Sequence, residues 1–436
     1  MNLTDVTIER LAFGGSGVGR IDGKVCFVPF SAPGDRVAVR VVKEHRSWLE
    51  AELVTVLEPA AVRVAPFCPV FGRCGGCDWQ HISYAAQTEA KRLILLETLQ
   101  RVGKLVEPSV GQTLAAAAPK GYRARAQFKL HRAPDGLQAG FYRRGSRFVI
   151  DLPDGCPVVR DPINAALRRL RQSLERLPDA DRVPQVSLEE GEAGCHAIVH
   201  YIGLDPERIC RFLARQAEQL NLAGLFLQSG RKETLVPVFG DERITYRVPA
   251  GDRELLLGYG IGGFSQVNRL QNQSMIRLVR HMLQGAPAGR LLDLYCGNGN
   301  LSLPLADLCT EVVGIEGYQP SIASAVDNSR QVRVNNSTFR CAEAGAELQR
   351  LAAAGERFGT VLLDPPRSGA LEAVKALPAL GASRIVYISC DPGTLARDLA
   401  ILIGQGGYRL ETAVPLDMFP QTGHLETVAC LTRTEH

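Results

Sequence analysis

The sequence lacks any long apolar run. No stretch of the chain reaches the ~18 consecutive apolar residues of a membrane-spanning helix. The first residues, MNLTDVTIER, carry charges where a secretory signal peptide has its apolar segment. A net charge of only +4 in 436 residues neither indicates nor excludes nucleic acid, because phosphate contacts depend on where Lys and Arg lie. We therefore expect a soluble, cytoplasmic protein of roughly two to four domains, with no membrane partner.

The chain has 12 cysteines, and we expect no export signal. Because the cytosol keeps thiols reduced, we expect no disulfide framework, and some cysteines should bind metal or take part in chemistry. Cys68, Cys74 and Cys77 fall in CPVFGRCGGC, whose glycines predict a tight loop that can bring three thiolates to one centre. This spacing fits zinc and an iron–sulfur cluster equally well.

Two segments, residues 1–60 and 120–149, raise the question of RNA binding. Residues 1–60 form short alternating runs separated by turn residues, which predicts a small β-barrel. Their charges nearly cancel, so a packing module and an RNA binder are equally compatible with them. Residues 120–149 are strongly basic, which fits strands that contact phosphates and stack on unpaired bases, but also an amphipathic hairpin with one solvated face. The aromatic residues among them are Tyr122, Phe128, Phe141, Tyr142 and Phe148.

From about residue 263 the chain alternates apolar strand-like runs with helical segments. The runs GRLLDLYC, EVVGIEG, FGTVLLDPP and RIVYISC each end in a turn or at a polar residue. This alternation predicts a parallel sheet with helices on both faces. The active edge of such a sheet lies at the carboxyl ends of its strands.

The first of these strands leads into a glycine turn, Gly297 to Asn300, that lets the backbone approach a ligand. A dinucleotide-binding turn prefers a third glycine where Ser302 stands, so this one argues against NAD. Glu316 ends the next strand and can accept hydrogen bonds from ribose hydroxyls, which suits an adenosyl ligand. A surface glutamate is the alternative, and the glycine turn upstream makes us favour the ligand role. Asp364 lies in a rigid Asp-Pro-Pro turn and can orient a cofactor or a base.

Cys390 follows the strand RIVYIS, where helix N-termini and backbone amides can favour the thiolate. A thiolate that adds to carbon 6 of uracil makes carbon 5 able to accept a methyl group, whereas methylation of an exocyclic amine needs no thiol. A base must then remove the carbon 5 proton. Glu426 and His424 share one face of a predicted strand, and we favour Glu426, with an inert surface role as the alternative.

The remaining cysteines have no comparable neighbours in the sequence. A cysteine in an apolar strand or helix is usually an inert, buried side chain, and this is our expectation for all of them. They are Cys26, Cys195, Cys210, Cys296, Cys309, Cys341 and Cys430.

The motifs FSQVN, LYCGNGN, IEG, LLDPPRSG, SCDPGTLARDL and DMFPQTGHLE together resemble those of the RNA 5-methyluridine methyltransferase family, in its RumA/RlmD-type branch of 23S rRNA uracil-5 methyltransferases. The resemblance spans nearly the whole chain. It implies that Cys390 is the nucleophile and Glu426 the proton acceptor. Glu343 stands where relatives carry an amide near the adenine. The residues that it implies around S-adenosylmethionine are Gln266, Tyr295, Asn300, Glu316 and Asp364.

The resemblance also implies a domain plan. Residues 1–60 look like a TRAM (OB-like) barrel that binds RNA, 61–262 like a central α+β domain with a 4Fe-4S cluster, and 263–436 like a Rossmann-like S-adenosylmethionine-dependent methyltransferase domain. The implied cluster role is structural. The implied ligands are Cys68, Cys74, Cys77 and Cys156.

The expected substrate is a uridine of 23S ribosomal RNA, and no obligatory protein partner is evident. The alternatives are carbon 5 methylation of a tRNA uridine by the same residues, and a metal-stabilised RNA-binding protein without catalysis. Nothing in the catalytic motifs separates the two RNA substrates.

Overall fold

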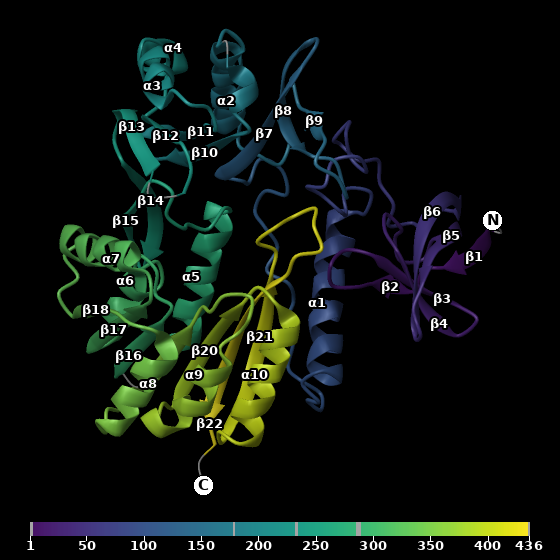
Figure 1. Ribbon diagram of the computed structural model, residues 1–436. Helices are drawn as coiled ribbons and strands as arrows, with labels where there is room; N and C mark the ends of the chain where they lie inside the picture. Colours follow the sequence, from purple (N-terminus) through teal and green to yellow (C-terminus); the bar gives the residue numbers. More distant parts are fainter. Residues whose placement is uncertain (1–2, 178, 232–233, 285–288, 435–436) are drawn as a thin grey trace.

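The structure is a computed structural model. It describes residues 3–177, 179–231, 234–284 and 289–434. Within these residues no helix has the length and apolar character needed to cross a membrane. The strands form three larger sheets and one two-stranded sheet (Figure 1).

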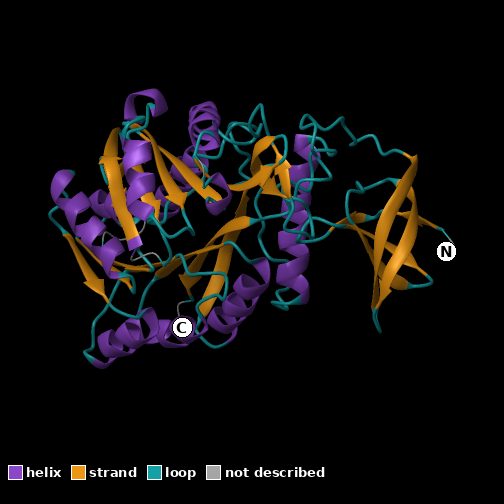
Figure 2. Ribbon diagram, turned by 45° about the horizontal axis from the view of Figure 1, so that its top comes forward, coloured by secondary structure: helices purple, strands orange, loops and turns teal. Residues whose placement is uncertain are grey.

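The N-terminal unit is a six-stranded sheet in the order β1-β5-β6-β4-β3-β2. All neighbours pair antiparallel except β4 and β6, and β1 also approaches β3, so the sheet curls around its own small core. Figure 2 shows this part of the described chain as strands and loops alone. The strand-rich N-terminal unit predicted from the sequence is thereby confirmed. Its strands are β1 (Thr4–Thr7), β2 (Arg10–Leu11), β3 (Gly17–Ile21), β4 (Lys24–Val28), β5 (Arg36–Glu44) and β6 (Trp48–Glu58).

A loop and one long helix connect this unit to the rest of the molecule. Residues 59–83 contain no helix or strand, as expected for the cysteine-rich segment, and α1 (Tyr84–Arg101) follows. Trp79 at the end of the loop is fully buried, and its indole Nε1 donates a hydrogen bond to the Gly15 carbonyl at 2.9 Å. α1 packs against β2 on one side and against β21 and α10 on the other.

The central unit is a seven-stranded sheet in the order β13-β12-β11-β10-β7-β8-β9. The helix α2 packs against β8, β10 and β11. Apolar side chains from the helix and from the sheet form the core of the central unit. The basic segment 120–149 gives the hairpin β7–β8, as its pattern predicts. The elements are β7 (Arg125–Ala133), β8 (Gly136–Tyr142), β9 (Val149–Asp151), α2 (Asp161–Glu175), η1 (Ala180–Arg182), β10 (Gln185–Gly191), β11 (Gly194–His200), α3 (Pro206–Ala214), α4 (Ala217–Leu220), β12 (Gly224–Gln228) and β13 (Leu235–Gly240).

The C-terminal sheet has the order β18-β17-β16-β19-β20-β22-β21. One face packs against α1, α8, α9 and α10, and the other against α5, α6 and the hairpin β14–β15, so both faces are covered as predicted. The elements are β14 (Arg243–Ala250), β15 (Arg253–Gly260), α5 (Arg269–Leu283), β16 (Arg290–Leu294), α6 (Ser302–Leu305), η3 (Ala306–Leu308), β17 (Glu311–Glu316), α7 (Gln319–Gln331), β18 (Ser337–Cys341), α8 (Ala344–Ala353), β19 (Thr360–Leu363), α9 (Leu371–Ala376), η4 (Leu377–Leu380), β20 (Arg384–Ser389), α10 (Pro392–Gly404), β21 (Tyr408–Leu416) and β22 (Glu426–Arg433).

The prediction of a parallel sheet is confirmed for the strands named in it, β16, β17, β19 and β20, but the whole sheet is mixed because β22 is reversed. β22 runs antiparallel to both β20 and β21 and lies between them. The reason is the connection: β21 and β22 are joined by a loop, residues 417–425, and not by a crossover helix, so the chain turns back on itself. Because β22 is antiparallel, its first residue lies at the carboxyl end of β20.

Candidate active site

The predicted catalytic and cofactor residues converge on one edge of the C-terminal sheet. Tyr295, Asp364 and Cys390 each follow the last residue of a parallel strand, and Glu316 is the last residue of β17. Parallel neighbours end at the same edge, so their terminal residues meet there. Glu426 reaches this edge from the opposite direction, as the first residue of β22.

A cavity at the glycine turn is lined by four of the five residues predicted to bind cofactor, Gln266, Tyr295, Asn300 and Asp364. The fifth, Glu316, lies under the turn, where its carboxylate accepts hydrogen bonds from the backbone nitrogens of Gly297 at 3.3 Å and Tyr318 at 2.9 Å. The structure therefore brings the predicted residues together around the turn.

The backbone of the turn is held in a conformation that few residues adopt. Tyr295 has a φ of 64°, and Gly297 and Gly299 also have positive φ values. A non-glycine residue with positive φ is uncommon and costs about 1–3 kcal/mol, which the surrounding contacts must offset. Asn300 exchanges two hydrogen bonds with Asn272 of α5, at 2.8 and 2.9 Å, which fix the orientation of its amide.

Asp293 is a site residue that the sequence analysis missed. It belongs to β16, is fully buried, and lines the same cavity. Burial raises its pKa to about 7, while a hydrogen bond from Ser302 opposes the rise. Its Oδ1 has no hydrogen-bond partner among the described residues. An acid within the apolar run LLDL was the signal that could have identified it.

Glu343 is the N-cap residue of α8, where its carboxylate accepts a hydrogen bond from the Ala346 nitrogen at 2.9 Å. Its charge contributes to the raised pKa of Tyr295, after the larger effect of burial. The side chain therefore lies near the cavity but already has a structural partner.

Cys390 does not favour the thiolate in this structure, contrary to the sequence-based expectation. Burial raises the pKa of its thiol, the Glu426 carboxylate raises it further, and Arg367 lowers it by charge and by a hydrogen bond. The helix α10 begins next to Cys390, but the Gly393 and Thr394 nitrogens donate to Asp391 Oδ1, both at 2.9 Å. The amides expected to stabilise the thiolate are thus already used.

Glu426 is a buried carboxyl group, only 5% exposed. Burial and the nearby Asp364 raise the pKa of Glu426 well above its usual range, and Arg367 opposes the rise. The pKa of Asp364 is itself raised to about 7 by burial. Cys390, Asp364 and Glu426 therefore interact electrostatically at one point, with Arg367 as a cation that acts on both Cys390 and Glu426.

The expectation that His424 and Glu426 share a strand face is wrong. β22 begins at Glu426, so His424 belongs to the preceding loop, and its side chain is exposed. Its ring packs edge-on against Phe419 at 5.7 Å between centroids. Glu426 is thus the buried acid or base of the pair.

The four cysteines Cys68, Cys74, Cys77 and Cys156 line one cavity of about 400 Å³. Burial raises the pKa of Cys77 to about 12 and that of Cys156 to about 11, and the neighbouring thiols add to both shifts. Arg123, at the same cavity, acts in the opposite direction on both. Within the described residues, no group of three or more His, Cys, Asp or Glu side chains is arranged to hold a single metal ion.

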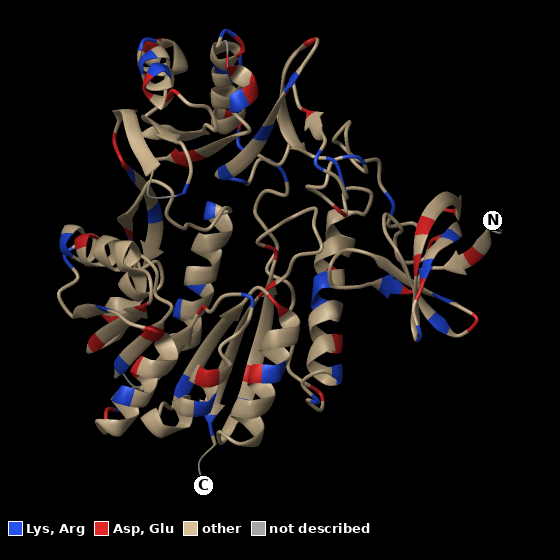
Figure 3. Cartoon of the chain, in the orientation of Figure 1, with Lys and Arg blue, Asp and Glu red and all other residues tan. Residues whose placement is uncertain are grey.

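The basic segment 120–149 has features of both predicted structures, a surface that can stack on unpaired bases and an amphipathic hairpin. Tyr122 and Phe128 are buried in the central core, whereas Phe148 is 76% exposed. Tyr142 is also exposed, and the Lys129 ammonium lies 5.4 Å from its ring centroid. Figure 3 shows Lys and Arg along β7, β8 and the nearby loops. The hairpin is therefore amphipathic, with two of its five aromatic rings available for stacking.

Most of the cysteines expected to be inert are buried or half-buried, but Cys341 at the end of β18 is exposed. Strand β18 is an edge strand, so its last side chain has no neighbouring strand to cover it. The expectation of burial is wrong for this cysteine.

A family model described as tRNA (uracil-5-)-methyltransferase matches residues 83–434, most of the chain. The chain belongs to this family. A TRAM-domain model matches residues 4–54, which are the strands of the N-terminal sheet. The predicted family, the TRAM domain and the predicted enzyme class, a uracil-5 methyltransferase, are thereby confirmed.

Two relatives are similar to this chain over almost the entire length of both proteins. The chain is 36% identical to the 23S rRNA (uracil(1939)-C(5))-methyltransferase RlmD of Thiobacillus denitrificans, over 98% of this chain and 99% of that protein. It is 38% identical to the same-named protein of Alkalilimnicola ehrlichii, over 98% and 96% of the two chains.

The fold is shared with a solved structure. The Pyrococcus abyssi tRNA (uracil-54, C5)-methyltransferase, in complex with S-adenosyl-L-homocysteine, superposes with a TM-score of 0.74 and 26% identity. The match covers 98% of this chain and all of that one. The chain therefore has the S-adenosylmethionine-dependent methyltransferase fold with mixed α/β sheets.

We predict that Arg367→Gln moves the reactivity of Cys390 to higher pH. Arg367 lowers the pKa of the Cys390 thiol, so its removal raises that pKa and reduces the thiolate fraction at any given pH. The measurement is the rate of iodoacetamide alkylation of Cys390 as a function of pH, followed by peptide mass spectrometry. Lys375→Gln, an exposed cation on α9, is the matched control, and an unshifted profile for Arg367→Gln would contradict the assignment.

Proposed function

We propose that this protein transfers a methyl group from S-adenosylmethionine to carbon 5 of a uridine in 23S ribosomal RNA, through a transient bond between Cys390 and carbon 6 of the base. The observation that carries this proposal is the convergence of Cys390, Asp364 and Glu426 at one sheet edge, beside the cavity at the glycine turn. A thiol, a buried carboxyl group and an adjacent cofactor cavity are what this reaction requires.

In the proposed mechanism Cys390 attacks carbon 6 as a thiolate. The carbon–sulfur bond forms, and the electron pair of the carbon 5–carbon 6 double bond makes carbon 5 nucleophilic. S-adenosylmethionine, when bound, would supply an electrophilic methyl group: the bond from its sulfur to the methyl group would break as the bond to carbon 5 forms, and S-adenosylhomocysteine would remain. Glu426 then accepts the proton from carbon 5, the double bond re-forms, and Cys390 leaves as a thiolate. Because burial raises the pKa of Glu426, its ionised form is a stronger base than an exposed carboxylate.

We propose that Gln266, Tyr295, Asn300, Glu316 and Asp364 bind S-adenosylmethionine. The lining of the cavity supports this, because it offers amide, phenol and carboxyl groups around a glycine turn that leaves backbone space. The Glu316 carboxylate has lone pairs beyond those used by its two backbone donors, and these suit ribose hydroxyl groups.

The choice of 23S ribosomal RNA over tRNA rests on the relatives. Those named for 23S ribosomal RNA are 36% and 38% identical to this chain, whereas the solved tRNA enzyme is 26% identical. The exposed rings of Tyr142 and Phe148 and the TRAM domain offer surfaces for an unpaired strand. We propose domains at residues 1–60, 61–262 and 263–436, with RNA choice in the first two, and a cytoplasmic location.

We further propose that Cys68, Cys74, Cys77 and Cys156 hold a 4Fe-4S cluster with a structural role. The spacing of the cysteines suits zinc as well, and the resemblance of the motifs favours the cluster. A cluster binds each cysteine through a separate iron, which suits thiols spread around a cavity of about 400 Å³. Arg123 provides a nearby positive charge for an anionic centre.

The substrate is tested by incubating the purified protein with labelled S-adenosylmethionine and total RNA from cells that lack the modification. We expect label in 23S ribosomal RNA, at the uridine equivalent to position 1939 of the relatives, found by fragment mapping. Label confined to tRNA would replace the substrate assignment, and absence of label from both RNAs would contradict the proposed function.

The roles of the two catalytic residues are separated by their variants. Cys390→Ala should reduce turnover by at least ~10³-fold and form no denaturant-stable complex with RNA that contains 5-fluorouridine. Glu426→Gln should still form the carbon–sulfur bond and should accumulate the methylated RNA–protein complex, because proton removal fails, with turnover lower by ~10²–10⁴-fold. Arg409→Gln, an exposed residue of β21, is the control. Full turnover by Cys390→Ala would rule out the covalent route.

The metal assignment is tested on protein purified without oxygen. We expect about four irons and four sulfides per chain, with a visible absorption band that Cys77→Ser weakens and Cys210→Ser leaves unchanged. Stoichiometric zinc, without iron in any preparation, would contradict the cluster.

A further inference from the structure

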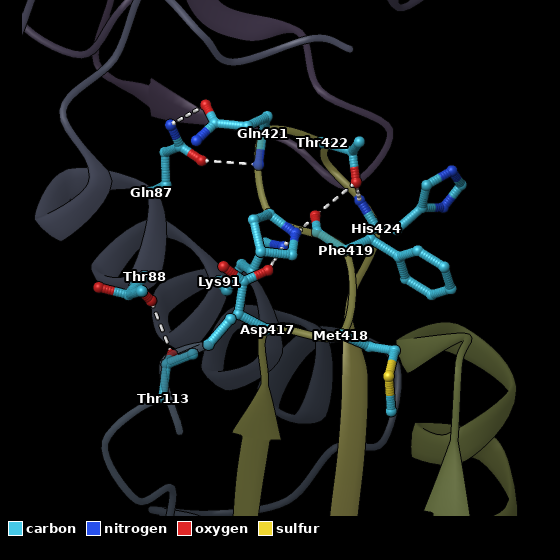
Figure 4. A network of polar contacts seen from close by, with 12 residues as sticks. Gln87, Thr88, Lys91, Thr113, Asp417, Met418, Phe419, Gln421, Thr422 and His424 are labelled. Carbon is cyan, nitrogen blue, oxygen red and sulfur yellow. Dashed lines mark hydrogen bonds and ion pairs between the residues drawn. The ribbon is translucent and has the colours of Figure 1, made fainter. Parts of the chain in front are cut away.

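The position of Glu426 depends on the loop that precedes it. Glu426 pairs directly with Leu416 of β21, and the loop between them, residues 417–425, extends from the sheet toward α1 and the central unit (Figures 1 and 4). Thr427, the next residue, pairs with Ser389, which precedes Cys390. A small movement at the start of β22 therefore changes the approach of Glu426 to a base bound at Cys390.

A buried ion pair holds the first residue of this loop. The Lys91 ammonium donates to Asp417 Oδ1 at 2.5 Å and to the Phe419 carbonyl at 3.2 Å, and both charged side chains are fully buried. Removing two charges from water is costly, and such a pair is weak evidence for added stability. A fixed geometry explains the pair better, because the ammonium joins two points of the loop.

Gln87, one turn earlier on α1, holds the middle of the loop. Its Nε2 donates to Gln421 Oε1 at 3.0 Å, and its Oε1 accepts from the Gln421 nitrogen at 3.1 Å. Gln421 has a φ of 69°, a conformation that needs such support in a non-glycine residue. Figure 4 shows both α1 side chains facing the loop.

The cysteine-rich loop and the N-terminal sheet complete the attachment. The Asp78 and Trp79 nitrogens donate to the Gln421 carbonyl at 2.9 and 3.0 Å. Gly423 lies so close to the N-terminal sheet that an added Cβ would be 2.5 Å from the Gly15 nitrogen. The loop before Glu426 is thus held by α1, the cysteine-rich loop and the N-terminal sheet. Tyr122 and Asn268 add side-chain hydrogen bonds to the Pro420 and Met418 carbonyls, at 3.1 and 3.2 Å.

We propose that Lys91, assisted by Gln87, is a positioning residue for Glu426. It holds the β21–β22 loop so that the carboxylate reaches the carbon 5 proton of the methylated base. This inference rests on the proposed function and concerns its last step. Loosening the loop should slow proton removal and release of the RNA, while the attack by Cys390 and the methyl transfer, which do not need Glu426, continue.

The test is single-turnover kinetics of Lys91→Met with labelled S-adenosylmethionine and the RNA substrate. We expect the methyl group to enter RNA at a rate within about twofold of wild type, whereas release of free methylated RNA slows by about tenfold or more. The labelled, denaturant-stable complex between protein and RNA should accumulate, as for Glu426→Gln. Arg101→Met, an exposed residue of the same helix, should leave both rates unchanged.

Folding is checked by circular dichroism and thermal melting of the full chain. Should Lys91→Met fail to fold, Gln87→Leu, which leaves no buried charge unpaired, carries the same expectation. Equal loss of methyl transfer and release in a folded variant, or no accumulated complex, would overturn the inference. If wild type itself forms no complex with 5-fluorouridine RNA, the proposed function fails instead.

Discussion

The site depends on the antiparallel placement of β22 between β20 and β21. In an all-parallel sheet every strand would bring its last residues to the active edge, and Glu426 would lie at the far end. Reversing one strand brings the first residue of β22 next to the end of β20. A thiol from one strand and a carboxyl group from its neighbour can then act on adjacent atoms of one pyrimidine ring.

This proximity has an electrostatic consequence. Three acidic groups, Cys390, Asp364 and Glu426, lie together in a buried place, and burial raises the pKa of each. Burial is the main cause of the raised pKa values. For Cys390 and Glu426 the charges of neighbouring acidic groups add to it, so ionising one group makes it harder to ionise these two. Arg367 opposes this effect, because its positive charge lowers the pKa of Cys390 and of Glu426. In the proposed reaction the thiolate charge passes to the base as an enolate when the carbon–sulfur bond forms, and it is neutralised when carbon 5 takes up the methyl group. This removes one obstacle to the ionisation of Glu426 just before it is needed as a base.

Much of the fold followed from local sequence patterns. The alternation of strands and helices, the basic hairpin and the residues at strand ends were predictable because each depends on nearby residues. The reversed β22 was not, since its direction follows from the loop 417–425, whose sequence does not state where the chain turns. Asp293 and Arg367 were missed, because their importance arises from burial and from neighbours distant in sequence. The thiolate expectation for Cys390 failed for the same reason: Asp391 uses the helix amides.

The distant contacts also explain why a long chain surrounds a small reaction centre. The hydrogen bonds of Lys91 with Asp417 and of Gln87 with Gln421 join residues 326 and 334 positions apart, and Tyr122 and the Pro420 carbonyl are 298 positions apart. The β21–β22 loop, residues 417–425, therefore takes its position only when α1, the cysteine-rich loop and the central unit have packed against it. The cysteine-rich loop contributes to these contacts, because Asp78 and Trp79, whose nitrogens donate to the Gln421 carbonyl, directly follow Cys77. The shape of the cysteine-rich loop is therefore coupled to the position of the loop before Glu426.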